Sequence, residues 1–289
     1  MKRNVELSEI SDGRLYTAND MVKTDCFDCQ GCSACCHGMG TSIVLDPMDI
    51  WRLQRGSGLD FAALMEKYIE LNVVDGMILP NLKLAGQTEA CAFLNAEGRC
   101  SVHEFRPGIC RLFPLGRYYE EEGFKYFLQI YECKKENRGK VKIKKWLGIS
   151  NLSAYEKYIA DWHRFLLDCE AGIQTLDEEN TRILNLYVLK MFYQTAYESE
   201  EFYGEFYERL QQVKNTLGIK VKMEQVKYIS WMLQNSKIRN AFRNIMRCFQ
   251  RAGRRKSMHI GWTMRKDYLL GQAFCWSGGC ENIIFVSVM

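Results

Sequence analysis

The feature that most constrains this chain is a run of cysteines near its start. Residues 26–36 read CFDCQGCSACC, which places three successive CxxC spacings before an adjacent pair of thiols. Two intervening residues allow a turn to bring both sulfurs to one ion at about 2.3 Å, and thiolates suit zinc, cuprous copper and iron–sulfur clusters. Because the adjacent Cys35 and Cys36 are expected to point in different directions, the pair favours two metal ions or one polynuclear cluster.

More thiols follow in the next hundred residues. Cys91, Cys100 and Cys110 are separated by about nine residues each, and Cys133 comes after a longer gap. Four ligands complete a zinc site or one cubane cluster, so eight or nine thiols could serve two sites. One or two of them could instead be buried apolar cysteines. The predicted metal ligands are Cys29, Cys32, Cys35, Cys36, Cys91, Cys100, Cys110 and Cys133.

Two histidines and three arginines accompany these thiols. His37 directly follows the adjacent pair and His103 lies close to a later cysteine. Either could be a nitrogen ligand, but ordinary hydrogen bonding is the commoner role for such residues. The positive charges of Arg106, Arg111 and Arg117 could neutralise an anionic thiolate centre, and simple salt bridges are the alternative.

The compartment decides how the cysteines are interpreted. The first twenty residues lack the apolar stretch of a secretory signal, and nowhere do about 18 consecutive apolar residues suggest a membrane span. We therefore expect a cytoplasmic protein with no transmembrane segment, in which thiols stay reduced unless a metal or a catalytic cycle uses them. The total of 13 cysteines is odd and excludes complete internal pairing, so we do not expect a disulfide framework.

Prolines and cysteines divide the chain into parts of different design. All four prolines lie at or before Pro114, and nine of the thirteen cysteines lie at or before Cys133. We predict an α+β protein in which an irregular, cysteine-rich metal-binding domain with short strands precedes a mainly α-helical region. The predicted segments are an N-terminal extension (1–22), a cysteine-cluster domain (23–148), an α-helical region (149–250) and a basic tail with no clear periodicity (251–289).

Local patterns predict individual elements. Asp46 and Pro47 predict the cap and first position of a helix that runs to about Arg55. Apolar spacing predicts a further helix over residues 59–71, and short strands are predicted over 42–45, 78–84, 91–94 and 124–131. Helical spacing continues over residues 155–167, 178–197, 201–217 and 223–249. The aromatic side chains expected to pack in this helical core are Tyr155, Tyr158, Trp162 and Phe165.

The basic residues are concentrated in one stretch. Between Lys220 and Lys266 thirteen Lys or Arg stand against one acid, Glu224, a local charge of +12 in a chain of net charge +4. Such a patch can attract nucleic acid, an acidic partner or anionic lipid. A solvated helix face is the simpler interpretation of the same pattern.

Four motifs of the N-terminal half resemble a known family. They are CQGCSACC at 29–36, LDPMDIWRL at 45–53, CAFL at 91–94 and RPGICRLFPL at 106–115. In this order they are similar to the YkgJ-type cysteine-cluster family of zinc- or iron-chelating domains, over about residues 27–133. The resemblance implies ligand roles for the predicted cysteines up to Cys110. It covers Cys133 by order only, since Lys134 stands where a proline is common, and Cys26 is additional to the family pattern.

Some longer members of this family resemble flagellin lysine-N-methylases, which also join a cysteine-cluster module to a helical region. That resemblance implies S-adenosylmethionine as a cofactor and flagellin or another protein as the substrate. The chain lacks the strand and glycine-rich turn that ordinarily hold a nucleotide cofactor, and it lacks a C-x3-C-x2-C spacing. Catalytic and cofactor-binding residues are therefore not predicted.

Three functions stay open at the level of sequence. The chain could be a cluster-dependent enzyme such as a protein lysine methyltransferase, or a metal-handling protein without catalysis. It could also bind nucleic acid or an acidic partner through residues 220–266, with the metal serving only to stabilise the fold. The repeated C-x2-C spacing favours an iron–sulfur cluster slightly over zinc.

Overall fold

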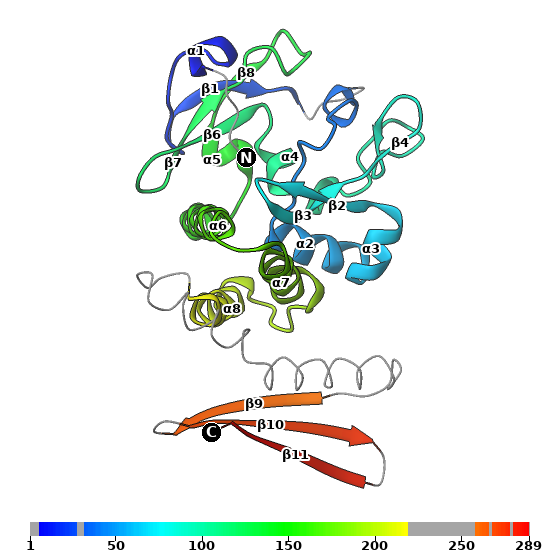
Figure 1. The fold of residues 1–289 in the computed structure, drawn as a ribbon. Coiled ribbons are helices and arrows are strands. Elements are labelled where there is room, and N and C mark those ends of the chain that lie inside the picture. Colours follow the sequence, from blue (N-terminus) through cyan, green and yellow to red (C-terminus); the bar gives the residue numbers. More distant parts are fainter. Residues whose placement is uncertain (1–5, 28–31, 219–257, 266–267, 278–279, 289) are drawn as a thin grey trace. The chain divides into compact units, whose positions relative to one another are not determined.

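The computed structural model describes residues 6–27, 32–218, 258–265, 268–277 and 280–288 (Figure 1). The chain divides into two compact units, Met1–Ile219 and Lys220–Met289. The first unit contains the cysteine-rich segment and the helices that follow it. No helix in the described parts of the chain has the length and apolar character needed to cross a membrane. The cytoplasmic location stays a prediction.

Short helices and two-stranded antiparallel sheets make up the first part of this unit. The helical elements are α1 (Leu7–Ile10), the 3-10 turns η2 (Ala34–Cys36) and η3 (His103–Phe105), α2 (Pro47–Ser57), α3 (Phe61–Lys67), α4 (Gly108–Leu112) and α5 (Ile143–Leu147). The paired strands are β1 (Met21–Asp25) with β8 (Gly139–Lys142), β2 (Ile69–Val74) with β3 (Met77–Leu82), β4 (Leu84–Ala85) with β5 (Ala90–Cys91), and β6 (Leu115–Tyr119) with β7 (Phe124–Leu128). Longer helices follow, so the predicted α+β class is confirmed.

The second part of the unit is helical, as the apolar spacing predicts. Its elements are α6 (Leu152–Ile173), α7 (Glu178–Leu189), a π-helical turn η4 (Lys190–Gln194) and α8 (Phe202–Leu217). Tyr155, Tyr158, Trp162 and Phe165 are all at most 5% exposed, which confirms their predicted place in the core. The helix predicted over 223–249 lies outside the described residues.

Helix α2 begins where the sequence predicts. The Asp46 carboxylate accepts from the Asp49 amide at 2.9 Å, and the Asp49 carboxylate accepts in return from the Asp46 amide at 3.1 Å. This reciprocal pair is a capping box that satisfies two otherwise free helix donors, with Pro47 in the first turn. Gly58 ends the helix in the left-handed conformation at φ 71°.

Three local predictions were wrong. Of the strand predicted over 91–94, only Cys91 lies in a strand, at the end of β5. Residues 42–45 form no strand, because only Val44 pairs, in a single bridge to Asn81. The helix predicted over 59–71 ends at Lys67, and β2 starts at Ile69. The residues after Ile69 alternate between the two faces of a hairpin whose two-residue loop, Asp75-Gly76, has positive φ at both positions. This loop conformation favours an Asp-Gly hairpin and explains the early end of the helix.

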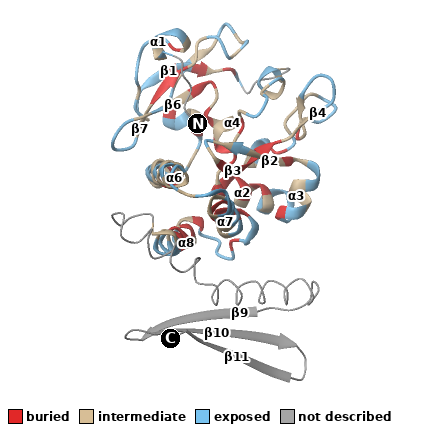
Figure 2. Ribbon diagram, viewed as in Figure 1, coloured by how far each residue is buried: buried red, intermediate tan, exposed pale blue. Residues whose placement is uncertain are grey.

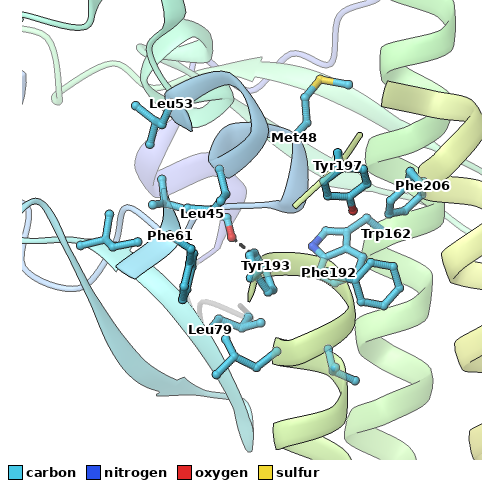
Figure 3. Packing of buried hydrophobic residues seen from close by; sticks show 14 of the residues in the cluster. Leu45, Met48, Leu53, Phe61, Leu79, Trp162, Phe192, Tyr193, Tyr197 and Phe206 are labelled. Atoms are coloured by element: carbon cyan, nitrogen blue, oxygen red, sulfur yellow. Dashed lines mark hydrogen bonds between the residues drawn. The ribbon is translucent and has the colours of Figure 1, made fainter. Parts of the chain in front are cut away.

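Side chains from both parts of the first unit pack into one core. Figure 3 shows residues of this cluster from both parts: Leu45, Met48 and Leu53 on or beside α2, and Trp162, Phe192, Tyr193 and Phe206 of the helical part. The Tyr193 hydroxyl donates to the Leu45 carbonyl at 3.1 Å. In Figure 2 the buried residues gather along α2, β3 and α7. The predicted division of this unit at residue 148 stays a prediction.

The described backbone of the second unit is a three-stranded antiparallel sheet. Its strands are β9 (Met258–Arg265), β10 (Tyr268–Ser277) and β11 (Cys280–Val288), in the order β9-β10-β11. The sequence of this tail has no clear periodicity and predicts no regular structure. Aromatic and β-branched residues, as in IIFVSV at 283–288, favour such strands.

Arg209 holds the turn between α7 and α8. Its Nη1 donates to the Met191 and Thr195 carbonyls at 2.8 and 2.7 Å, and its Nη2 donates to the Ala196 carbonyl at 2.6 Å. The same Nη2 bonds the Glu205 carboxylate. The residue is only 8% exposed, so its guanidinium has little access to water in place of these acceptors.

The substitution Arg209→Met is expected to lower the free energy of unfolding by about 2–3 kcal/mol, because it removes the charged donor of three carbonyls and of one oxygen of the half-buried Glu205 carboxylate. Urea unfolding followed by circular dichroism measures this loss. The control is Arg164→Met, which removes an exposed guanidinium that bonds one carbonyl, that of Glu121. We expect the control to change stability by less than about 1 kcal/mol. Equal losses in the two variants would contradict the role assigned to Arg209.

Candidate metal centre

Two short segments lie side by side, and they carry two thiols of the N-terminal run and the first of the later thiols. Cys35 and Cys36 lie in η2, and Cys91 ends β5. The residue after η2, His37, pairs with Ala90 in a single antiparallel bridge, and the Gly38 amide donates to the Glu89 carbonyl at 3.1 Å. Thiols separated by more than fifty residues in the sequence are therefore held at one place.

The other thiols reach the same place from two further segments. Cys100 pairs with Leu94 in an isolated bridge, and the adjacent Ser101 amide donates to the Phe93 carbonyl at 2.9 Å, so this loop folds back on the residues after β5. Cys110 lies in α4. One cavity of about 160 Å³, here called the thiol cavity, is lined by six cysteines: Cys32, Cys35, Cys36, Cys91, Cys100 and Cys110.

The remaining cysteines of the N-terminal half have different positions. Cys29 lies outside the described residues, so its predicted role stays a prediction. Cys133 is partly buried but does not line the thiol cavity, although its neighbour Glu132 does. Cys26 is 6% exposed and is also absent from the lining. Cys169 is fully buried in the helical core and provides a thiol with no link to the cavity.

The adjacent thiols contact each other and line the same cavity. A hydrogen bond from the Cys36 side chain lowers the pKa of Cys35 to about 6, and the positive charge of Arg106 acts in the same direction. The same bond, together with burial, raises the pKa of Cys36. Cys35 is also exposed, so the lowered pKa makes it the thiol of this pair that ionises first.

Burial opposes ionisation of the other thiols. It raises the pKa of Cys91, Cys100 and Cys110, and the negative charges of neighbouring groups add to this effect. A metal cation reverses this balance, because a coordinating thiol loses its proton to the metal–sulfur bond. The donor set is therefore the one that suits zinc or an iron–sulfur cluster.

Coordination requires the thiols to move closer together. Within the described parts of the chain, no three His, Cys, Asp or Glu side chains stand close enough to hold an ion as they are. The thiols come from loops and single turns, which can shift at lower cost than long helices or wide sheets. Binding of a metal is thus expected to draw these loops together.

The two histidines make hydrogen bonds. The His37 ring lies 3.4 Å from both the Ser33 hydroxyl and the Thr88 carbonyl. His103 lines the thiol cavity, and its Nε2 lies 3.0 Å from Arg106 Nη1. Neither contact assigns a metal-ligand role.

Of the three predicted arginines, Arg106 is the one that lines the thiol cavity. Arg111 donates to the Glu104 carbonyl at 2.7 Å, and Arg117 donates to the Tyr155 hydroxyl at 3.1 Å. The charge of Arg106 favours the ionised forms of both Cys35 and Cys100, which supports the neutralising role predicted for it.

Comparison with known proteins gives one match. Residues 28–138 match a family model named CxxCxxCC and described as "Putative zinc- or iron-chelating domain". This match agrees with the resemblance of the same residues to the cysteine-cluster family. The matched range contains all eight predicted ligands and ends five residues after Cys133. No curated protein matches the chain, and no solved structure matches it either.

A buried carboxylate that was not predicted from the sequence bonds the backbone close to one of the predicted ligands. Asp49 is 2% exposed, and its Oδ1 accepts from the Gly108 amide at 2.7 Å, two residues before Cys110. Burial and the nearby Asp46 raise the pKa of Asp49 to about 7. A sequence signal existed in the LDPMD motif, where a second acid follows the capping aspartate by three residues.

A second, larger cavity of about 590 Å³ adjoins the thiol cavity. Ser42, Ile109, Leu115 and Gln129 line both cavities. Since Ile109 precedes Cys110, a molecule in the larger cavity would lie next to the thiol cavity. The volume falls within the range of small-molecule sites.

Proposed function

We propose that this protein binds an iron–sulfur cluster or zinc at the thiol cavity. One observation carries the proposal, namely that six cysteines from four separate segments line a single cavity in the domain of a zinc- or iron-chelating family. The proposed ligands are Cys32, Cys35, Cys36, Cys91, Cys100 and Cys110, together with Cys29 and Cys133 from the sequence pattern. More than four thiols favour a polynuclear cluster or two ions over one tetrahedral zinc.

The residues around the cavity suit an anionic metal centre. The low pKa of Cys35 supplies an accessible first thiolate, and Arg106 offsets part of the negative charge that several thiolates bring. An iron–sulfur cluster would supply electron transfer there, whereas zinc would supply Lewis acidity or structural stability. We favour iron–sulfur because successive C-x2-C spacings are typical of cluster ligation.

Anaerobic purification, metal analysis and a visible spectrum test this proposal. A brown protein with stoichiometric iron and sulfide is expected, and a colourless protein with stoichiometric zinc would support the metal site while identifying the other metal. Removing the metal with a chelator should lower the melting temperature, because coordination holds together loops with few other contacts. A folded protein that takes up neither metal under reducing conditions would contradict the proposal.

A second candidate function is methyl transfer to a protein lysine, with S-adenosylmethionine as donor and flagellin or another protein as acceptor. Its support is the resemblance of longer cysteine-cluster proteins to flagellin lysine-N-methylases, together with the large cavity beside the thiols. Calorimetry with the metal-loaded protein tests donor binding, and mass spectrometry of flagellin tests the reaction. Product that forms with the wild type and fails with Cys32→Ser would support it.

The alternative is metal handling without catalysis, and the rate at which the metal exchanges distinguishes it from a resident metal centre. A metal that transfers to a competing chelator within minutes would favour delivery, whereas a stoichiometric metal that resists removal would favour a resident centre. Binding of nucleic acid through residues 220–266 would instead weaken steeply with added salt.

A further inference from the structure

The larger cavity is formed by segments from across the first unit. Residues of α1, α2, β6 and α6 line it, together with residues near the β2–β3 turn. Its aromatic and apolar wall includes Trp162, Tyr119 and Phe127. The His163 ring stacks on Tyr119, with ring centroids 3.6 Å apart and planes inclined by 18°. Such a wall can enclose the apolar body of a small molecule.

Most of the charged side chains that line this larger cavity are acidic. Five are acids and one is a base: Glu6, Asp46, Asp49, Asp75 and Glu170 against Arg117. The Arg117 guanidinium donates to the Tyr155 hydroxyl and lies 5.5 Å from the Phe124 ring centroid, and its positive charge also acts on Asp46. We call this space the acidic cavity.

Two of the acids are held rigidly at the inner wall. Asp46 Oδ1 accepts from the Tyr158 hydroxyl at 3.0 Å and from the Asp49 amide at 2.9 Å. Burial raises the pKa of both carboxyl groups by more than their hydrogen bonds and the positive charge of Arg52 lower it, so the surroundings compensate their negative charges incompletely. A cation close to Asp46 and Asp49 would compensate their negative charge and favour their ionised forms.

We propose that the acidic cavity binds a small organic cation, an amine or a sulfonium that carries an apolar body, directly beside the metal centre. Its charge would face Asp46 and Asp49, and its apolar body would lie along Trp162 and Tyr119. The four residues shared with the thiol cavity place this ligand next to Cys110. The test compounds are chosen on the basis of the proposed methyl transfer, and in that respect the cation site rests on the proposed function. Binding of the cation is nevertheless measured separately from methyl transfer.

Two pairs of compounds that differ mainly in charge test this inference on the metal-loaded full chain. The first pair is S-adenosylmethionine and its neutral product S-adenosylhomocysteine. The second is Nα-acetyl-lysine amide and the uncharged Nα-acetyl-norleucine amide. Calorimetry should show that at least one cation binds about tenfold or more tightly than its neutral counterpart, as expected for a charge that meets partly buried acids.

Two matched variants test whether the negative charge of Asp46 causes the preference for the cation over its neutral counterpart. Asp46→Asn removes the charge but keeps an oxygen that can accept the Asp49 amide and Tyr158 hydroxyl bonds, so the helix cap is preserved. The control Asp60→Asn makes the same change at the exposed cap of α3, where Asp60 accepts from the Ala63 amide at 2.8 Å. The preference for the cation should fall to about threefold or less in Asp46→Asn and persist in Asp60→Asn.

The outcomes separate this inference from the proposed functions. Metal content is measured on every sample, so a loaded protein that binds neither cation, or binds the neutral compounds equally well, overturns the cation site and leaves the metal site standing. An unchanged preference in Asp46→Asn also overturns it. Tight binding of a cation without methyl transfer to flagellin would support the site and refute the methylase.

Discussion

Replacing Cys110 with alanine is expected to abolish stoichiometric metal binding, whereas replacing Cys169 with alanine should leave it unchanged. Both thiols are buried enough that the pKa of each is raised, to about 12 for Cys169. Only Cys110 lines the thiol cavity, and Cys169 packs among core side chains of the helical part. A general effect of thiol removal on folding would act on both variants, so their difference isolates the ligand role.

Metal analysis of both variants after anaerobic purification measures this difference. Loss of a ligand leaves the other thiols with an incomplete site, so we expect iron or zinc in Cys110→Ala to fall to background while Cys169→Ala keeps the wild-type stoichiometry. Thermal unfolding of the metal-free proteins provides the check on folding. If Cys110→Ala retained full metal content, Cys110 would have to be removed from the ligand set.

The cysteine-cluster segment could be predicted because its signal is local. Thiols spaced by two residues predict coordination without knowledge of the fold, and the capping pattern of Asp46 and Pro47 acts within one helical turn. The helices after residue 150 were predictable for a similar reason, since their apolar residues recur at helical spacing. In both cases residues close in sequence supply enough information.

The features that were missed depend on distant partners or on turn geometry. Residues 69–74 could continue the helix or form the first strand of a hairpin. The Asp75-Gly76 turn, with positive φ at both residues, favours the hairpin only because β3 is available to pair with β2. The acidic cavity combines Glu6, Asp46 and Glu170, which no spacing in the sequence connects. Similarly, nothing in the local sequence links Asp49 to Gly108, fifty-nine residues away.

The bond between Asp49 and Gly108 leads to the second large expected effect. Asp49→Ala should lower the free energy of unfolding by about 2–4 kcal/mol, because it leaves the buried amide of Gly108 and the partly buried amide of Asp46 without their acceptor. Asp60→Ala removes a carboxylate from an exposed helix cap and should cost about 1 kcal/mol. Urea unfolding of the metal-free proteins compares the two directly.

The same bond should also affect the metal, because it fixes the backbone at the start of α4, which carries Cys110. The space is tight there, since a Cβ atom on Gly108 would lie 2.1 Å from the Tyr155 hydroxyl oxygen. Asp49→Ala is therefore expected to weaken metal binding in a competition assay with a chelator, by about 10–100-fold as for other groups that orient a ligand. Asp60→Ala should not change the affinity. If both variants bound metal like the wild type while Asp49→Ala was destabilised, Asp49 would support the fold alone and would not orient Cys110.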